Sequence, residues 1–179
     1  MTLSTDEREF AEKLLKNSLA GLKQVVSGLT ADQLGHCLEG GWTPLGILAH
    51  LYVVEVGIMR RLPNSPPPEV LRADRDLRIL ALIRDRSRRM VAPEPVVPDG
   101  RQTDPDELLK KLDRVREISL TWLADVTVDA RAHAMEHPFL KTLDGYQWLL
   151  TIAAHMERHT EQIAEIKASL TFPVSPPLV

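Results

Sequence analysis

Residues 148–166 read WLLTIAAHMERHTEQIAEI, a pattern that predicts one continuous helix. Steps of three and four residues keep one stripe on the same side of this helix: Trp148, Ile152, His155, His159, Ile163, Ile166 and Leu170. An unpaired polar ring in an apolar interior costs about 1–3 kcal/mol, so the two histidines within the stripe need compensation. Hydrogen bonds inside the core, a solvated cleft or a metal ion would each supply it.

The beginning of this helix is marked by its capping residues. Asp144 suits the N-cap position, and Gln147, three residues later, completes a capping box. Leu143 and Trp148 are spaced for a hydrophobic staple across the same turn. We therefore expect the helix to begin after Asp144 and to continue to about Leu170.

Earlier segments carry the same helical period. A first helix is predicted at about residues 6–28, and a short helical turn at 31–36. Thr43 and Pro44 provide an N-cap and a first-turn proline for a helix that runs to about residue 61, and Asp104 and Pro105 do the same for a helix to about 126. Another helix is expected between residues 71 and 90. The stripes expected to face the core are Phe10, Leu14, Leu19, Leu22, Val26 and Leu29, then Ile47, His50, Val54 and Ile58, then Leu71, Leu77, Leu80, Ile83 and Met90, and finally Leu108, Leu112, Val115, Ser119, Trp122 and Val126.

The connections between these helices complete the prediction of the fold class. Residues 62–68 and 93–100 are rich in proline and read as connections within one domain. Residues 130–140 are compatible with an extended or a helical form. Because no alternating β-branched run of strand length stands out, the chain is predicted to be all-α, most simply an antiparallel four-helix bundle with extra short helices. Its 179 residues suit a single domain, 1–179, with an irregular proline-containing tail at 172–179.

Charge and cysteine content disfavour several classes of partner. The 22 basic and 25 acidic residues give a net charge of −3, which supplies no field to attract nucleic acid or an anionic membrane. The arginine-rich segment 72–89 lacks interleaved aromatic residues, so it is interpreted as a solvated face with mixed ion pairs; phosphate or nucleic-acid binding is the alternative. Cys37 is the only cysteine, no signal peptide follows Met1, and the most apolar stretch, 148–154, is far shorter than the roughly 20 residues of a membrane span. A soluble, cytoplasmic protein is expected.

A third histidine lies on an apolar helical face. His50 shares its face with Ile47, Val54 and Ile58, which turns it inward like His155 and His159. Two histidines at positions i and i+4 and a third on another helix are the arrangement by which bundles build metal sites, with Nε2 atoms about 2.0–2.1 Å from the ion. Three imidazoles leave at least one coordination position open.

The spacing of His155 and His159 also resembles the zinc-protease motif His-Glu-x-x-His. The general-base glutamate of that motif would fall at position 156, where this chain has Met156. Glu157 is about 160° round the helix from that position. A metalloprotease is therefore disfavoured.

Two motifs together resemble the DinB-like family of bacterial metal-binding four-helix bundles. The first is Gly41-Trp42-Thr43-Pro44 leading into Ile47-Leu48-Ala49-His50-Leu51. The second is His137-Pro138 followed by a helix that reads Trp148-Leu149-Leu150 through His155-Met156-Glu157-Arg158-His159 to Gln162-Ile163. The resemblance covers the second and last helices well and the middle of the chain poorly. It implies that His50, His155 and His159 bind a divalent ion, nickel, zinc or iron in different members, with solvent on the open side and frequently a homodimer.

The other candidate residues do not qualify as ligands. His36 lies in a polar turn and is expected to be exposed, and no stripe places His133. His137 precedes Pro138 and is interpreted as an end-of-helix residue, or one that supports a ligand from behind, rather than as a ligand. Cys37 is a possible thiolate, but a small buried or half-exposed residue is the simpler interpretation.

The resemblance also suggests a function. Characterised relatives include thiol-dependent S-transferases and a thiol-dependent maleylpyruvate isomerase, and some members are described as hydrolases. The leading hypothesis is a metal-dependent transferase that takes a small-molecule substrate and a low-molecular-weight thiol in an apolar pocket. The alternatives are a metal-dependent hydrolase, and a helical dimerisation or interaction protein whose metal is structural or absent. Glu157, Arg158 and Glu161 are not placed to act as a general base.

Overall fold

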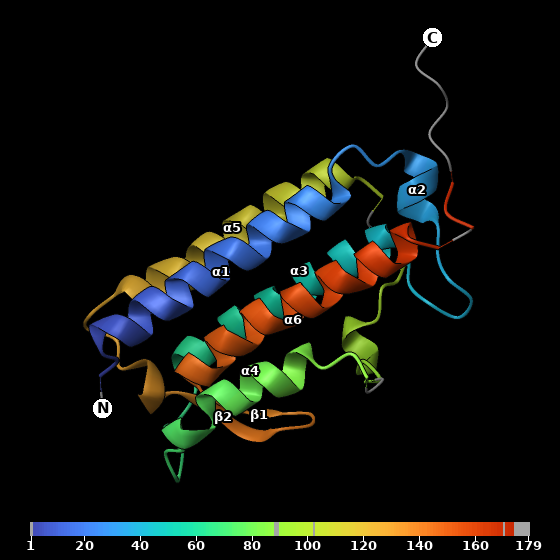
Figure 1. Ribbon diagram of the computed structural model, residues 1–179. Coiled ribbons are helices and arrows are strands. Elements are labelled where there is room, and N and C mark those ends of the chain that lie inside the picture. Colours follow the sequence, from blue (N-terminus) through green and yellow to red (C-terminus); the bar gives the residue numbers. More distant parts are fainter. Residues whose placement is uncertain (1, 88–89, 102, 170, 174–179) are drawn as a thin grey trace.

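The computed structural model describes residues 2–87, 90–101, 103–169 and 171–173. Four long helices make the body of the molecule (Figure 1): α1 (Thr5–Val26), α3 (Pro44–Arg61), α5 (Pro105–Ala124) and α6 (Gly145–Lys167). The shorter elements are α2 (Ala31–Gly35), α4 (Asp76–Arg84), four 3₁₀ turns, η1 (Leu62–Asn64), η2 (Ala73–Arg75), η3 (Glu94–Val96) and η4 (Ala130–Ala132), and two strands, β1 (Ala134–His137) and β2 (Lys141–Asp144). No described helix is long and apolar enough to cross a membrane.

The predicted caps begin the long helices. The side chain of Asp144 accepts the backbone N–H of Gln147, and that of Thr43 accepts the backbone N–H of Gly46. Asp104 caps α5 in the same way. The predicted helix at 44–61 is confirmed at both ends, and those predicted at 6–28, 31–36 and 105–126 differ by one or two residues, as is usual for fraying helix ends. The helix expected between residues 71 and 90 is wrong at both ends, because α4 covers only Asp76–Arg84 and a 3₁₀ turn, η2, precedes it. The expected end of the last helix, Leu170, lies outside the described residues, as do 174–179 of the tail.

Helices α1 and α6 run in the same direction. At one end Tyr146 donates a hydrogen bond to the carbonyl of Glu7 at 3.1 Å, and at the other Lys167 donates to the carbonyl of Val25 at 2.7 Å. Helices α3 and α5 run together in the opposite direction (Figure 1). The four-helix arrangement is confirmed, but the directions do not alternate along the chain as in the simplest antiparallel bundle.

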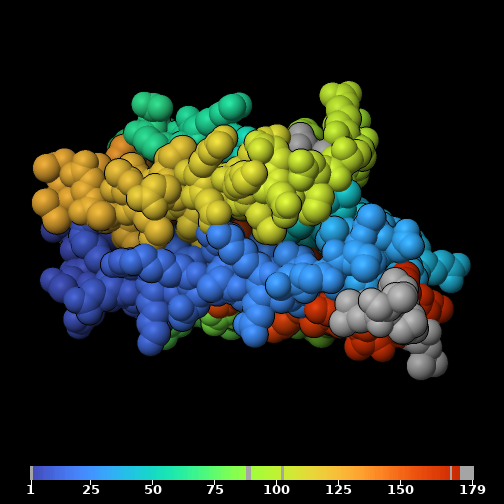
Figure 2. All heavy atoms as spheres, turned by 90° about the horizontal axis from the view of Figure 1, so that it is seen from above, coloured from blue at the N-terminus to red at the C-terminus, as the bar shows by residue number. Residues whose placement is uncertain are grey.

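The long connection between α3 and α5 explains these directions. Residues 62–104, which include α4, return along the whole length of the bundle, so that α5 begins at the same end as α3 (Figure 1). Helices α1 and α5 then lie side by side in opposite directions (Figure 2). The evidence for the directions is that Lys23, near the end of α1, bonds Asp113 in the first half of α5. A short hairpin connection would have reversed α5 instead.

A small hairpin corrects the all-α prediction. Strands β1 and β2 pair in antiparallel fashion, from Ala134 opposite Asp144 to His137 opposite Lys141. Each strand has four residues and lacks the β-branched alternation typical of strands. The extended part of residues 130–140 is strand β1, which is held by its pairing with β2 rather than by an intrinsic preference of its residues. Strand β2 leads directly into the N-cap of α6.

Three predicted core positions are wrong. Phe10, Leu77 and Val126 are exposed, and their places in the core are taken by Leu15, Ile79 and Leu123, which are buried. Leu77 is 73% exposed because α4 begins only at Asp76 and presents Ile79, Leu80 and Ile83 to α6. Met90 lies beyond the end of α4, and Arg88 and Arg89 lie outside the described residues.

Candidate metal centre

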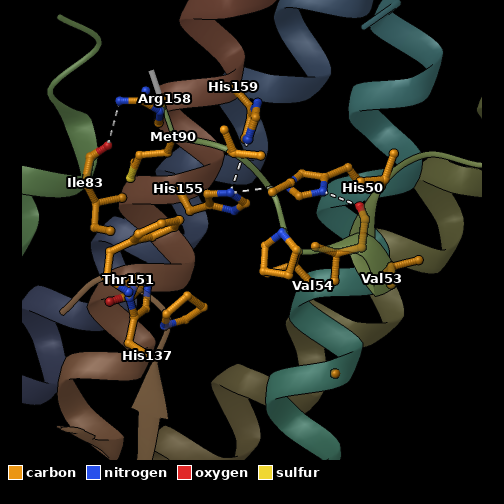
Figure 3. Close-up of a pocket in the computed structure, with 18 of the residues that line it drawn as sticks. His50, Val53, Val54, Ile83, Met90, His137, Thr151, His155, Arg158 and His159 are labelled. Atoms are coloured by element: carbon orange, nitrogen blue, oxygen red, sulfur yellow. Dashed lines mark hydrogen bonds between the residues drawn. The ribbon is translucent and has the colours of Figure 1, made fainter. Parts of the chain in front are cut away.

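His50 on α3 meets His155 and His159 on α6 (Figure 3). Nε2 of His155 lies 3.3 Å from Nε2 of His50 and 3.1 Å from Nε2 of His159. One ring nitrogen from each histidine lies within 4.8 Å of the other two. A tetrahedral ion bonded at about 2.0–2.1 Å places neighbouring ligand nitrogens about 3.3–3.4 Å apart, so the spacing fits one ion.

The outer nitrogens of two rings determine which inner nitrogens have a free lone pair. Nδ1 of His50 donates to the carbonyl of Val96 at 2.7 Å, and Nδ1 of His159 donates to Oε1 of Gln162 at 2.8 Å. In a neutral imidazole the proton on Nδ1 leaves Nε2 as an acceptor. Two lone pairs therefore converge on Nε2 of His155, whose one possible proton could satisfy only one of them.

Burial keeps these rings neutral. It lowers the pKa of His50, although the hydrogen bond to Val96 acts in the opposite direction. Burial, reinforced by the neighbouring His50, lowers the pKa of His159 to about 3, and burial also lowers the pKa of His155 well below its usual value. Only the neutral ring binds a metal, so the site is competent for ligation over the physiological pH range.

Trp42 closes one side of the triad. Its ring centroid lies 4.7 Å from that of His50, and its plane is stacked on His159 at 6.0 Å with an angle of 16°. Trp42 immediately precedes the N-cap Thr43 and the first-turn residue Pro44, so the start of α3 positions both the tryptophan and His50. The loop before α3 and the histidines of α6 therefore meet at one site.

A cavity of about 870 Å³ adjoins the triad. It lies between α3, α6, the hairpin and segment 90–97, and apolar side chains at its edge are exposed to solvent: Val53, Val91, Val97 and Phe139. Glu39 and Glu136, both exposed, are the carboxylates among the described residues that line it. The triad thus faces a largely apolar space large enough for organic molecules.

The remaining predicted candidates lie outside the triad. Cys37 is a free cysteine and is exposed, so the expectation of a buried or half-exposed residue is wrong. His36, expected to be exposed, is half-buried and contacts the ring of Phe172 edge-on. His133, which no helical stripe places, packs against Trp122. Sequence reasoning missed two supports of the triad: Gln162, which its i+3 spacing from His159 could have indicated, and Val96, whose backbone carbonyl no residue type could reveal.

Arginines of the segment 72–89 pair with α6. Arg84 bonds Glu157 at 2.5 Å, and Arg86 bonds Glu165 at 2.8 Å. Arg158 donates to the carbonyls of Ile83 and Asp85 at the end of α4, which suits a cation at a helix C-terminus. The interpretation of mixed ion pairs therefore holds for these residues, and Glu157 is engaged away from the triad.

Residues 14–163 match the model of the DinB superfamily, and the chain belongs to this family. It is 24% identical over 133 residues to the uncharacterized protein YuaE of Bacillus subtilis (strain 168), over 72% of this chain and 79% of YuaE. Its fold is similar to that of YfiT from Bacillus subtilis, with a TM-score of 0.66, 19% identity, and coverage of 93% of this chain and 89% of YfiT. YfiT is described as a probable metal-dependent hydrolase with an unusual four-helix bundle topology.

Proposed function

We propose that this protein is a metal-dependent enzyme in which His50, His155 and His159 hold one divalent ion, nickel, zinc or iron, at the wall of the cavity. The observation that carries the proposal is the convergence of three buried imidazoles whose Nε2 atoms lie 3.1 and 3.3 Å apart in successive pairs. Hydrogen bonds to Val96 and Gln162 orient two of the rings for ligation. Imidazole ligands suit several transition metals, so the supply of metal in the cell selects among them.

A catalytic role is supported by the number of ligands and by the cavity. Structural zinc sites are closed by four protein ligands, whereas catalytic sites keep three and leave a position open. The triad offers three ligands, and the cavity lies on its free side. The alternative of a structural metal or none would leave this space without a use.

The groups that line the cavity favour a thiol cosubstrate over water. A bound divalent ion supplies Lewis acidity, which lowers the pKa of a ligated thiol or water. A free thiol has a pKa of about 8.5, far below the value of about 15.7 for water, so a thiol needs less help from a base. The described carboxylates of the cavity, Glu39 and Glu136, are exposed rather than held against the triad.

The chain's own residues would bind the reactants and keep water away from them. Apolar walls on α3 and α6 surround the space beside the triad. Trp42, which contacts His50, also lines this space. A cavity of about 870 Å³ accommodates a small electrophilic substrate together with a low-molecular-weight thiol. We therefore propose a thiol-dependent S-transferase, with a metal-dependent hydrolase as the second candidate because YfiT is described as one.

Elemental analysis of untagged protein, purified without chelator or affinity metal, tests the proposal. We expect nearly one metal per chain in the wild type, loss of the metal in His155→Ala, and retention of it in His36→Ala, which removes a histidine outside the triad. Loaded protein is then assayed with thiols plus electrophiles, and with esters and amides. A wild type that binds no zinc, nickel or iron even after reconstitution would overturn the proposal; ester or amide turnover without thiol dependence would select the hydrolase.

A further inference from the structure

His137 ends β1 and faces the same cavity as the triad (Figure 3). Its Nδ1 accepts the backbone N–H of Phe139 at 3.1 Å and that of Leu140 at 3.2 Å. A ring nitrogen that accepts hydrogen bonds carries no proton, so the proton of the neutral imidazole is on Nε2. Burial lowers the pKa of His137 to about 4, which keeps the ring in this neutral form at physiological pH. The histidine is therefore a fixed N–H donor.

The hairpin holds this ring in one position. The ring packs against Trp148, with centroids 5.3 Å apart, and Arg75 donates to the carbonyl of Leu140 at 2.8 Å, which anchors the turn. The turn closes through Lys141, whose φ of 61° lies in the left-handed region that favours glycine. Such a conformation persists in a non-glycine residue only where the surroundings hold it, and it commonly accompanies a functional site. The packing of Trp148 and the hydrogen bond from Arg75 therefore both hold His137 in place.

Two polar groups on this wall lack partners among the residues that the structure describes. Nε2 of His137 makes no hydrogen bond to them, and neither does the hydroxyl of Thr151. Thr151 is only 4% exposed, lines the cavity and lies one helical turn before His155 on α6. A buried hydroxyl without a partner is costly, and native structures keep such groups where a ligand or water completes them.

We propose that His137, with Thr151 beside it, forms a subsite for an oxygen acceptor, a carbonyl or carboxylate oxygen of the substrate. The Nε2–H group donates and does not accept, so it selects an oxygen acceptor and offers nothing to an ammonium group. Apolar walls beside it suit a hydrophobic body attached to that oxygen. The assignment of this oxygen to a substrate that reacts at the triad rests on the proposed function. The subsite itself is made by the chain's own residues and does not need the metal.

The first test is the tautomer of His137. In protein labelled with ¹⁵N-histidine, long-range ¹H–¹⁵N spectra distinguish a protonated from an unprotonated ring nitrogen. We expect protonated Nε2 and unprotonated Nδ1 for His137, assigned by loss of its signals in His137→Asn. The opposite tautomer, or a charged ring at pH 7, would overturn the proposal without reference to any metal.

The second test is binding of benzoate and benzamide, which present a carboxylate and a neutral carbonyl, with benzylamine as a probe that has no acceptor oxygen. Titration calorimetry is done on metal-free and on zinc-loaded protein. His137→Asn keeps an acceptor near the Nδ1 position for the turn but removes the Nε2–H group, whereas His137→Gln restores a donor near that point. We expect the Kd of at least one of the two oxygen probes to rise about three- to tenfold in His137→Asn, to recover in part in His137→Gln, and to rise in Thr151→Val.

The outcomes separate the subsite from the metal proposal. If zinc does not bind but benzoate or benzamide binding depends on His137, the proposed function fails and the subsite stands. If zinc binds while neither probe saturates, or while His137→Asn binds both as the wild type does with unchanged far-ultraviolet circular dichroism, the subsite is overturned and the metal centre stands. Equal binding of benzylamine would also overturn the selectivity for an acceptor. A response to benzoate alone assigns a carboxylate, and a response to both probes assigns a carbonyl oxygen.

Discussion

Glu55 on α3 and Arg116 on α5 form an ion pair inside the bundle, with each side chain only 2% exposed. Two hydrogen bonds of 2.9 Å join the guanidinium to both carboxylate oxygens, and Ser119 donates a third to the carboxylate at 2.9 Å. Arg116 also donates to Ser18 on α1 at 3.0 Å. The pair connects three helices where apolar side chains alone would permit several registers.

Removal of one partner of this pair should destabilise the fold strongly. Glu55→Ala leaves the Arg116 guanidinium buried without its counter-charge, and such changes cost about 3–5 kcal/mol. The double variant Glu55→Leu with Arg116→Met replaces both charges by apolar groups and should lose much less. Urea unfolding with metal-free protein measures both. Equal losses in the single and double variants would show that packing, and not the unpaired charge, determines the effect.

Gln162 should tune metal affinity without being a ligand. In Gln162→Leu, Nδ1 of His159 loses the acceptor at 2.8 Å that orients the ring, and loss of such a support lowers affinity about 10–100-fold. The stoichiometry at saturating metal should remain that of the wild type. Competition with a chromophoric chelator gives the affinity. Glu161→Gln, a change at an exposed neighbour, serves as the control and should bind as the wild type does.

The metal-free protein should lose stability as the pH falls below about 6.5. Burial lowers the pKa of His137 to about 4, whereas a histidine in the unfolded chain titrates near 6.5. Between these values the unfolded state binds a proton that the folded state lacks, so protonation favours unfolding. The contribution of His137 is about 2 kcal/mol between pH 6.5 and 5. This slope fades above pH 6.5 and is nearly absent about one pH unit higher.

The variant His137→Asn isolates this contribution. Urea unfolding of wild type and variant at pH 7, 6 and 5, with a chelator present, should show the flatter pH dependence in the variant. Parallel profiles would mean that the His137 ring takes up its proton equally well in the folded protein. The titration of histidines that do not interact with His137 affects both proteins equally, whereas His155, whose pKa is lowered by burial and also by the neighbouring His137, adds to the difference.

Arg131 joins the start of α6 to two other helices. Its side chain, 2% exposed, bonds Glu7 on α1 at 2.6 Å, Asp76 on α4 at 2.6 Å and Asp144, the N-cap of α6, at 2.9 Å. Burial lowers the pKa of a guanidinium, but the hydrogen bonds that Arg131 donates to Asp76 and Glu7, together with the negative charge of Asp144, outweigh it and raise the pKa of Arg131. The arginine therefore remains charged among three acids.

Arg131→Met should cost about 3–5 kcal/mol in unfolding free energy, since it leaves the buried carboxylate of Asp144 and the half-buried one of Asp76 without their cation. Asp76→Asn should cost less, because Glu7 and Asp144 still pair with the arginine. Thermal unfolding followed by circular dichroism ranks the two variants. A larger loss in Asp76→Asn than in Arg131→Met would contradict the central role of Arg131.

Parts of the site differ in how far sequence could predict them. The inward direction of His50, His155 and His159 follows from helical periodicity, and the caps at Thr43 and Asp144 are local hydrogen bonds between near neighbours. The sequence predicts for His137 only a supporting or end-of-helix role, and the helix end is wrong because His137 ends strand β1. Its place at the cavity depends on a hairpin whose strands have little intrinsic preference for the extended form, so no local pattern indicated it.

The amino-acid sequence is enough to predict the long helices, their starting residues and the faces on which the three histidines lie, because period and capping are properties of short segments. Family membership could be expected for the same reason, since both motifs are local. Three features come from the folded arrangement of the helices instead: α3 and α5 run in the same direction, Glu55 meets Arg116, and the carbonyl of Val96 orients His50. These contacts join residues 46 to 61 positions apart and depend on the path of the connection at 62–104, which no helical period encodes.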